Sequence, residues 1–322
     1  MKNSKKIFIL TEVILAALVV VTAVSMFGER NGKVRGRVSV IIQDSDNSQW
    51  SAFKYGLRMA AEDLEMEMFV VSTSGQMSVD DEEELLQWEI ANGVDAVIVQ
   101  PVPGDEAGQM LKNVADNIPI MLVESGIPAD EDEENLPVTG PDHYAMGKTL
   151  AEELLKDYSG NIQGKTLGIF SEYASEAVAQ REAGFRSGIE EKGGTILWSV
   201  SEYGEEDTGN LEDQERVDFV IALDNGGLIK AGGASAQNDL HGVLVYGIGN
   251  STEAVYYLDY GSVECLVVPD EFNMGYQSLS EVAESLGFFS GDMESRTVSH
   301  TVIRSENLFT DENQELLFTM NQ

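Results

Sequence analysis

The chain has 322 residues, of which 43% are hydrophobic and 24% are charged, and its formal net charge is −36. This composition is that of a globular protein long enough for two lobes of about 100–150 residues each, and it excludes a fibrous or disordered chain. A surface this acidic repels nucleic acid and anionic lipid headgroups, so we expect no nucleic-acid partner.

The N-terminus carries a long apolar segment. Lysines at positions 2, 5 and 6 precede residues 7–27, a mostly apolar run of about 21 residues, close to one bilayer crossing. An uncleaved single-pass anchor in the cell membrane is the preferred interpretation, with the rest of the chain outside the cytoplasm. The alternative is a protein secreted after signal cleavage near residues 23–25. A lipoprotein signal is excluded because no cysteine precedes Cys265.

Beyond the linker that ends at residue 36, short β-branched runs alternate with segments whose apolar residues recur at helical spacing. Such alternation predicts a parallel sheet covered by helices on both faces. The expected strands are 38–42, 68–71, 94–99 and 119–123, and the expected helices are 50–64, 79–91 and 106–117.

A second series of the same kind follows the acidic loop 130–134. We interpret this loop as a solvated connection, because it lacks the spaced ligands and turn glycine of a calcium loop. Residues 203–216 are also polar and acidic, so the crossover helix expected there is predicted to be short, irregular or absent. The expected strands are 166–170, 195–198, 219–223, 242–246 and 263–268, and the expected helices are 144–157, 174–192 and 252–260.

Signs of catalysis or metal binding are missing. The single cysteine, Cys265, lies in an apolar run and is interpreted as a small buried side chain. The three histidines are far apart in the sequence, so we expect no metal, and no cofactor is expected. The segment 247–250 contains a glycine pair without the rest of a dinucleotide fingerprint, and the chain has no nucleophile elbow or phosphate loop. We therefore expect a binding protein and not an enzyme.

Several segments are similar to the sugar-binding, ribose-type family of type I periplasmic binding proteins, of which the chain looks like a divergent member. The order of these segments, over residues 37–305, is more specific than any one motif. They are DNSQWSAFKYG at 46–56, NGVDAVIVQP at 92–101, NIPI at 117–120, VTGPDHYAMG at 138–147, REAGF at 181–185, ALDN at 222–225, VYG at 245–247 and NMG at 273–275.

The resemblance implies an α/β protein with two doubly wound parallel-sheet lobes joined by a three-strand hinge, here preceded by the transmembrane segment. The expected division assigns residues 1–36 to a cytoplasmic stub, anchor and linker. The N-terminal lobe would comprise 37–138 and 270–301, and the C-terminal lobe 139–269 and 302–322. We expect the lobes to be monomeric.

Ligands of open α/β sheets bind beyond the carboxyl ends of the strands, so the candidate pocket residues are those that follow each strand. Planar amide or carboxyl groups that bind two hydroxyls would be Asn47, Glu124 and Asp224, and Trp50 would face the sugar ring. The full set is Asn47, Gln49, Trp50, Gln100 and Glu124 from the first lobe, and Tyr173, Asp224, Asn225 and Asn250 from the second.

Some candidates have a structural alternative. Trp50 could pack in the core of its lobe, Asn47 could cap the following helix, and Asp224 could serve the turn before Gly226. Glu124 ends an apolar strand, where a carboxylate is costly unless it meets solvent or a partner.

The chain departs from the family's ligand-binding pattern at four positions. The family's two arginines are replaced by Ser125 and by Ala179, with Arg181 nearby, and a late aspartate and a glutamine are replaced by Gly249 and Pro269. A pocket that keeps acids without arginines would be acidic and would suit a neutral polyol or a cation better than an anion. We therefore do not expect ribose as the ligand.

The resemblance implies a solute receptor for an ABC-type importer, with a small polar ligand such as a sugar or polyol and a membrane permease as partners. The alternative is an anchored sensor subunit that reports ligand to a membrane kinase, such as a histidine kinase. A third possibility is a degenerate interaction module without a small ligand. Only about ten residues separate the apolar run from the first strand, and so short a tether favours the sensor alternative.

Overall fold

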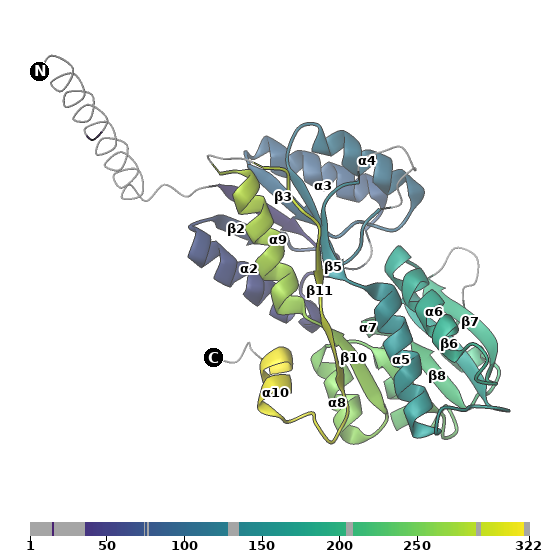
Figure 1. The fold of residues 1–322 in the computed structure, drawn as a ribbon. Helices are drawn as coiled ribbons and strands as arrows, with labels where there is room; N and C mark the ends of the chain where they lie inside the picture. Colours follow the sequence, from purple (N-terminus) through teal and green to yellow (C-terminus); the bar gives the residue numbers. More distant parts are fainter. Residues whose placement is uncertain are drawn as a thin grey trace, which may run out of the picture.

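The computed structural model describes residues 36–73, 75, 77–127, 135–203, 209–287 and 291–318, together with residue 15. Apart from residue 15, the predicted membrane segment 7–27 lies outside this part of the chain. None of the helices in the described ranges has the length and apolar character needed to cross a bilayer. The described residues form two α/β lobes, each built on a six-stranded sheet (Figure 1).

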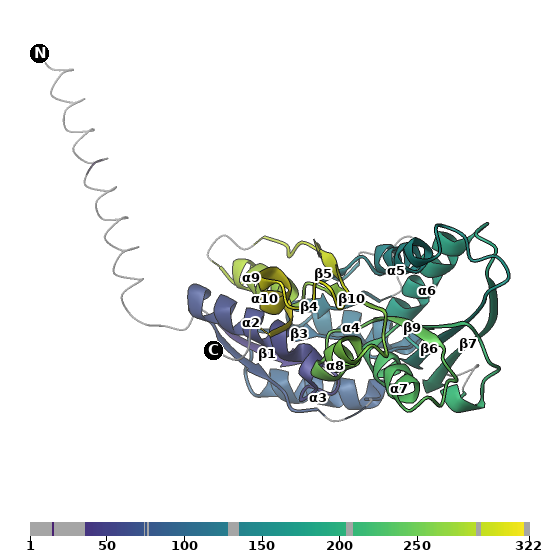
Figure 2. The same ribbon diagram turned by 90° about the horizontal axis from the view of Figure 1, so that it is seen from below.

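The first sheet has the order β11-β5-β4-β3-β1-β2, and every neighbouring pair in it is parallel. Helices α2 and α9 pack on one face, and α3 and α4 cover the other, as Figure 2 shows for α9 and α3. The strands are β1 (Arg37–Ile41), β2 (Glu67–Val70), β3 (Ala96–Val99), β4 (Ile120–Val123), β5 (Val138–Pro141) and β11 (Arg296–Val298). The helices are η1 (Ser48–Trp50), α2 (Ser51–Leu64), α3 (Val79–Ala91), α4 (Asp105–Ala115) and α9 (Glu271–Ser285).

The second sheet has the order β12-β10-β9-β8-β6-β7 and is parallel except for β12, which runs antiparallel to β10. Helices α5 and α6 pack on one face, and α7 and α8 on the other. The strands are β6 (Thr166–Tyr173), β7 (Thr195–Tyr203), β8 (Phe219–Ala222), β9 (Leu244–Ile248), β10 (Cys265–Pro269) and β12 (His300–Ile303). The helices are α5 (His143–Asp157), α6 (Glu176–Ile189), η2 (Leu211–Asp213), α7 (Asn225–Ala236), α8 (Thr252–Tyr260) and α10 (Asp311–Phe318).

Most helices begin at an acidic or hydroxyl side chain that accepts a hydrogen bond from a free backbone N–H of the first turn. Ser78 and Asp81 form a reciprocal capping box at the start of α3. The same role is played by Asp142 before α5, Ser175 before α6, Asp224 before α7, Ser251 before α8 and Asp270 before α9.

The described part of residues 203–216 agrees with the expected elements, whereas helix α7 was not among them. The described part of residues 203–216 contains one short 3-10 helix, η2, as expected for a short or irregular crossover. Helix α7 was not predicted, because four of its twelve residues are glycines, which lower helix propensity. These glycines allow close packing: a Cβ on Gly226 would lie 1.8 Å from Glu172 Oε2, and one on Gly232 would lie 2.8 Å from the Tyr257 ring.

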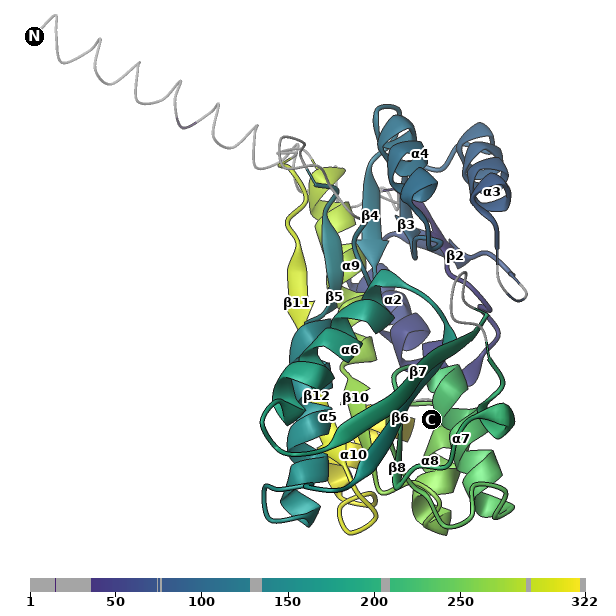
Figure 3. The same cartoon turned by 90° about the vertical axis from the view of Figure 1, so that its right-hand side faces the viewer.

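The chain passes between the two sheets three times, from β5 to α5, from β10 to α9 and from β11 to β12; Figure 3 shows the last passage beside the two lobes. The expected boundary at 138/139 falls at the start of β5, all of which lies in the first sheet. The boundary at 269/270 coincides with the end of β10. The boundary at 301/302 falls inside β12, which pairs with β10 in the second sheet.

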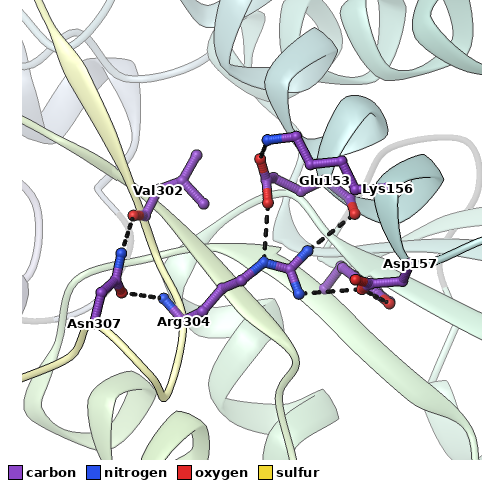
Figure 4. A network of polar contacts seen from close by, with 7 residues as sticks. Glu153, Lys156, Asp157, Val302, Arg304 and Asn307 are labelled. Carbon is purple, nitrogen blue, oxygen red and sulfur yellow. Dashed lines mark hydrogen bonds and ion pairs between the residues drawn. The ribbon is translucent and has the colours of Figure 1, made fainter.

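A network around Arg304 fixes the chain after the third passage to the second lobe (Figure 4). The guanidinium donates to Glu153 Oε2 at 2.9 Å, to the Glu153 carbonyl oxygen at 3.0 Å and to Asp157 Oδ2 at 3.1 Å. Both carboxylates belong to α5, and Glu153 also pairs with Lys156. Asn307 accepts from the Arg304 backbone N–H at 2.7 Å and donates to the Val302 carbonyl oxygen. The segment after β12 is therefore held against α5.

Candidate functional site

A cavity of about 340 Å³ lies between the lobes at the carboxyl ends of the strands in both sheets. This is the position where parallel α/β sheets place their ligands. All nine side chains predicted from the sequence line it: Asn47, Gln49, Trp50, Gln100, Glu124, Tyr173, Asp224, Asn225 and Asn250. Their contact with a ligand stays a prediction.

Trp50 and Asn47 have structural roles in addition to their position at the cavity. The Trp50 side chain is buried in the core of the first lobe, contacts Phe53 edge to face, and donates from Nε1 to the Gln43 carbonyl oxygen at 2.9 Å. Asn47 Oδ1 accepts from the Gln49 backbone N–H at 3.0 Å and caps η1. Both residues therefore shape the wall of the cavity through contacts within their own lobe.

The Asp224 carboxylate is hydrogen-bonded to backbone N–H groups around it. It accepts from the N–H groups of Glu172, Tyr173 and Gly227, at 2.7 to 3.1 Å. Burial raises the pKa of Asp224, and these three backbone hydrogen bonds act in the opposite direction. The carboxylate thus ties the end of β6 to the first turn of α7, which is the turn role left open by the sequence.

The remaining amides also bind backbone groups. Asn225 Oδ1 accepts from the N–H groups of Asn250 and Ser251, at 3.3 and 3.1 Å, and so joins α7 to the turn before α8. Asn250 Nδ2 reaches across the cleft and donates to the Gln49 carbonyl oxygen at 3.0 Å. Gln100 Oε1 accepts from the Gln43 N–H at 2.9 Å.

The pocket does contain an arginine, which corrects the expectation that the arginines are lost. Arg181 Nη2 lies 2.5 Å from Glu124 Oε1; the Arg181 side chain is buried and that of Glu124 is partly buried. Arg181 also donates to His143 Nδ1 at 3.1 Å and to the Leu223 carbonyl oxygen at 3.0 Å. From the sequence, Arg181 was placed in the REAGF segment and beside position 179, and not among the pocket residues. Its reach to Glu124 depends on the packing of α6 against the crossover.

His143 completes this cluster at the first crossover. Its Nε2 lies 2.8 Å from the carbonyl oxygen of Glu124, which adopts a left-handed φ of 69°. Burial, together with the Arg181 charge, lowers the pKa of His143 to about 4, so the ring is neutral at pH 7. Glu124 belongs to the first lobe and Arg181 and His143 to the second, so the cluster spans the hinge beside the cavity.

Besides Arg181, four charged lining residues were not predicted from the sequence: Asp44, Glu172, Lys230 and Glu271. Lys230, on α7, lies 2.9 Å from Glu172 Oε1 and also pairs with Glu202. Glu271 is the first residue of α9, directly after the second passage between the lobes. Its position after the expected strand 263–268 is the one sequence signal that could have marked it, because the candidates were chosen by this rule.

The rim of the cavity is aromatic on the side of the second lobe. The rings of Tyr173 and Tyr203 stack with centroids 5.3 Å apart, and Lys230 Nζ lies 5.1 Å from the centre of the Tyr203 ring. Burial raises the pKa of Tyr173, the nearby Glu172 charge adding to the effect. The Tyr173 ring therefore stays a neutral, apolar surface at the mouth of the cavity.

Known proteins with the same architecture include several solved sugar-binding proteins. A carbohydrate transporter solute-binding protein from Agrobacterium radiobacter, in complex with D-arabinose, is 17% identical with a TM-score of 0.75, covering 88% of this chain and 98% of its own. GanP, a glucose-galactose binding protein from Geobacillus stearothermophilus, is 20% identical with a TM-score of 0.71, covering 85% and 99%. The Caulobacter myo-inositol binding protein is 17% identical with a TM-score of 0.71, covering 87% and 97%.

At these identities the likeness establishes the fold. A comparison with curated proteins gives no match. Residues 38–287, which include the cavity and most of both lobes, match the periplasmic binding protein domain family. Members of this family bind solutes and are not enzymes, and a periplasmic domain implies a location outside the cytoplasm. The chain belongs to the periplasmic binding protein domain family.

Proposed function

We propose that this protein closes its two lobes on a small polar ligand, a sugar or related polyol, and presents it to a membrane partner. The observation that carries the proposal is the cavity of about 340 Å³ at the carboxyl ends of both sheets. Ligand sites of this kind have volumes of about 300–1,000 Å³ and combine apolar walls with a few fixed polar groups. Sugar and polyol ligands of the structurally similar proteins support the same class of ligand.

The cavity wall suits a polyhydroxylated molecule. Amide groups of Gln49, Gln100 and Asn250 line it beside the apolar side chains of Ile229 and Ile248. Hydroxyl groups require such donors and acceptors, whereas the C–H faces of a sugar require apolar or aromatic surface. Both positively charged lining residues, Arg181 and Lys230, are paired with carboxylates, which disfavours an anionic ligand.

The ligand class is tested by a thermal shift screen of the purified lobes, residues 36–322, against monosaccharides, polyols and amino sugars. A ligand present at 100 times its dissociation constant adds about 2.7 kcal/mol to the stability of the folded state. At least one polyhydroxylated compound should raise the melting temperature. If no member of the panel does so, while the protein unfolds cooperatively, the protein is an interaction module without a small ligand.

We propose the role of importer receptor as the primary function. Transport is supported by the similar solute-binding proteins, whose names assign them to carbohydrate or sugar transporters. Deleting the gene should abolish uptake of the ligand found in the screen, and restoring it should recover uptake. Unimpaired uptake together with a lost transcriptional response would contradict the transport role.

The alternative role, a sensor subunit for a membrane kinase, is favoured by one observation. The apolar run 7–27 is followed after about ten residues by β1, and so short a connection would hold the lobes beside a membrane partner at high effective concentration. An uncleaved anchor should keep the full-length protein with the membrane fraction after high-salt washing. A soluble mature form that begins near Met26 would instead identify residues 7–27 as a cleaved signal.

A further inference from the structure

Glu271 is a buried acid of the cavity wall that has no partner in the described part of the chain. It is 6% exposed and lines the cavity at the start of α9. Its carboxylate takes part in no hydrogen bond or ion pair among the described residues, and Oε2 is sealed from solvent. A buried polar group without a partner is costly, and in native proteins it calls for a specific explanation.

The other charged groups of the cavity are already matched. Arg181 is paired with Glu124, and Lys230 is paired with Glu172 and Glu202. Asp224 is satisfied by three backbone N–H groups, and Asp44 accepts from the Asn47 amide at 3.1 Å. Among the described lining residues, Glu271 is therefore the buried charged group that a ligand would pair, and a cation is the strongest partner for a carboxylate.

The surroundings of Glu271 determine its protonation. Burial raises its pKa well above the usual range, and the Glu124 carboxylate at the end of β4 and the neighbouring Asp270 act in the same direction. The Arg181 guanidinium, from α6, opposes them. His143, on α5, contributes no charge because it is neutral at pH 7. These surroundings favour the protonated form of Glu271, and an ammonium group brought by a ligand would displace the proton.

We propose that Glu271 determines the specificity of the cavity by forming an ion pair with a protonated amine on a polyhydroxylated ligand, such as an amino sugar. The inference rests on the proposed function, because it requires that the lobes close on a small polar molecule. It assigns to that molecule a positive charge, which the ligand class alone does not imply. Proton release from Glu271 accompanies binding, since the carboxyl group exchanges its proton for the ammonium of the ligand.

Isothermal titration calorimetry with matched sugar pairs tests the proposal on the purified protein at pH 7. The pairs are D-glucosamine with D-glucose, D-galactosamine with D-galactose, and D-mannosamine with D-mannose. A charge-assisted hydrogen bond to a buried group predicts about 10- to 100-fold tighter binding of the amine member in at least one pair. Titrations in two buffers with different ionisation enthalpies should show that protons are released when the amine member binds.

The variant Glu271→Gln separates a specific ion pair from a general effect of charge. The amine member should lose its advantage over the hydroxyl member, and its binding should no longer release a proton. Glu176→Gln is the matched control, because Glu176 is an exposed glutamate at the same position of α6, the first residue of the helix. This control removes the same charge and should leave both affinities as they are.

The outcomes distinguish the inference from the function on which it rests. Equal or tighter binding of the hydroxyl members would overturn the role of Glu271 and leave the sugar-binding function standing. Binding of neither member of any pair would overturn the role of Glu271, and the thermal shift screen would then decide separately whether the protein binds any sugar or polyol. An equal loss of amine affinity in Glu271→Gln and Glu176→Gln would assign the preference to net charge and overturn the ion pair.

Discussion

Arg181 is the residue whose removal should disturb the protein most. Its side chain is only 6% exposed and supplies the partner of the Glu124 carboxylate, whose side chain is 15% exposed. Removing one member of a buried ion pair leaves the other charge uncompensated, which typically costs about 3–5 kcal/mol. We expect Arg181→Met to lower the free energy of unfolding by about this amount, measured by urea denaturation.

Arg186 provides the control on the same helix. Its pair with Glu182 is partly exposed, so Arg186→Met should cost no more than about 1 kcal/mol. Adding Glu124→Gln to the Arg181→Met variant should recover part of the lost stability, because the unpaired charge is removed. Equal effects of the two arginine substitutions would contradict the assigned importance of the buried pair.

Glu82 makes the stability of the first lobe depend on pH. The side chain is fully buried on α3; its Oε1 accepts from the Val102 N–H at 3.2 Å, and its Oε2 has no partner among the described residues. Burial raises the pKa of Glu82 to about 8. Because the folded protein holds this proton more tightly than the unfolded chain, the stabilising contribution is complete below the ordinary value of 4.5 and is lost as the pH rises toward 8.

The variant Glu82→Gln should not show this loss. The difference in unfolding free energy between variant and native protein should grow from pH 5 to pH 8 by at most about 1.4 kcal/mol per pH unit, in favour of the variant. Denaturation curves across this range measure the difference directly, and other titrating groups cancel between the two proteins. A difference that does not change with pH would show that Glu82 is ionised throughout.

At the scale of the elements, each lobe has a pair of helices that cross closely at glycine residues. In the first lobe, a Cβ on Gly56 of α2 would lie 2.0 Å from the Phe272 carbonyl oxygen, and one on Gly275 of α9 would lie 2.1 Å from the Phe53 oxygen. In the second lobe, Gly147 of α5 and Gly184 of α6 meet backbone oxygens of the partner helix at 1.9 and 2.0 Å. The helices cross at backbone contact distance because these positions have no side chain.

Gly56→Ala should therefore destabilise the protein although alanine favours helices. Overpacking against a backbone oxygen costs about 1–3 kcal/mol, more than the gain of about 1 kcal/mol in helix propensity. In Gly233→Ala on α7 the new methyl would meet only the movable Tyr257 hydroxyl, at 3.1 Å, so this variant should be neutral or slightly stabilising. Thermal unfolding compares the two variants, and a gain in stability for Gly56→Ala would refute the close crossing.

At the scale of the whole molecule, the lobes touch across the mouth of the cleft. Ser48, in the first lobe, donates from Oγ to Glu253 Oε2 at 3.2 Å and accepts from the Thr252 N–H at 3.3 Å. Asn250 adds the bond to the Gln49 carbonyl oxygen. These contacts exist only when the lobes are close together, so they favour the closed arrangement of the hinge.

Ser48→Ala should shift the hinge toward an open form. The loss of hydrogen bonds worth about 1 kcal/mol changes the ratio of closed to open protein about fivefold, and the apparent ligand affinity falls with the closed fraction. Small-angle X-ray scattering should show a larger radius of gyration without ligand and the native value at saturation. Ser285→Ala, which removes a hydroxyl bound only within α9, is the control; the same scattering change there would contradict a hinge effect.

The sequence determined the architecture and the location of the site. Apolar β-branched runs alternating with amphipathic helices define a parallel sheet through local periodicity, and that sheet places its ligand site at the carboxyl ends of its strands. For this reason residues chosen only because they follow a strand, from Asn47 to Asn250, all line one cavity. Helix α7 was not predicted because glycines disfavour helices. In the fold these glycines allow close packing against Glu172 and Tyr257, which lie elsewhere in the sequence.

Only the tertiary structure determined which acidic side chains of the cavity have a hydrogen-bond or ion-pair partner. The Asp224 carboxylate binds backbone N–H groups, Glu124 is neutralised by Arg181 from 57 positions away, and Glu271 has no partner within the described ranges. Each outcome depends on side chains that the three passages between the lobes bring to one place. Local periodicity carries no information about such pairings, because the distance between two groups in the fold is set by how the elements pack and not by their separation along the chain.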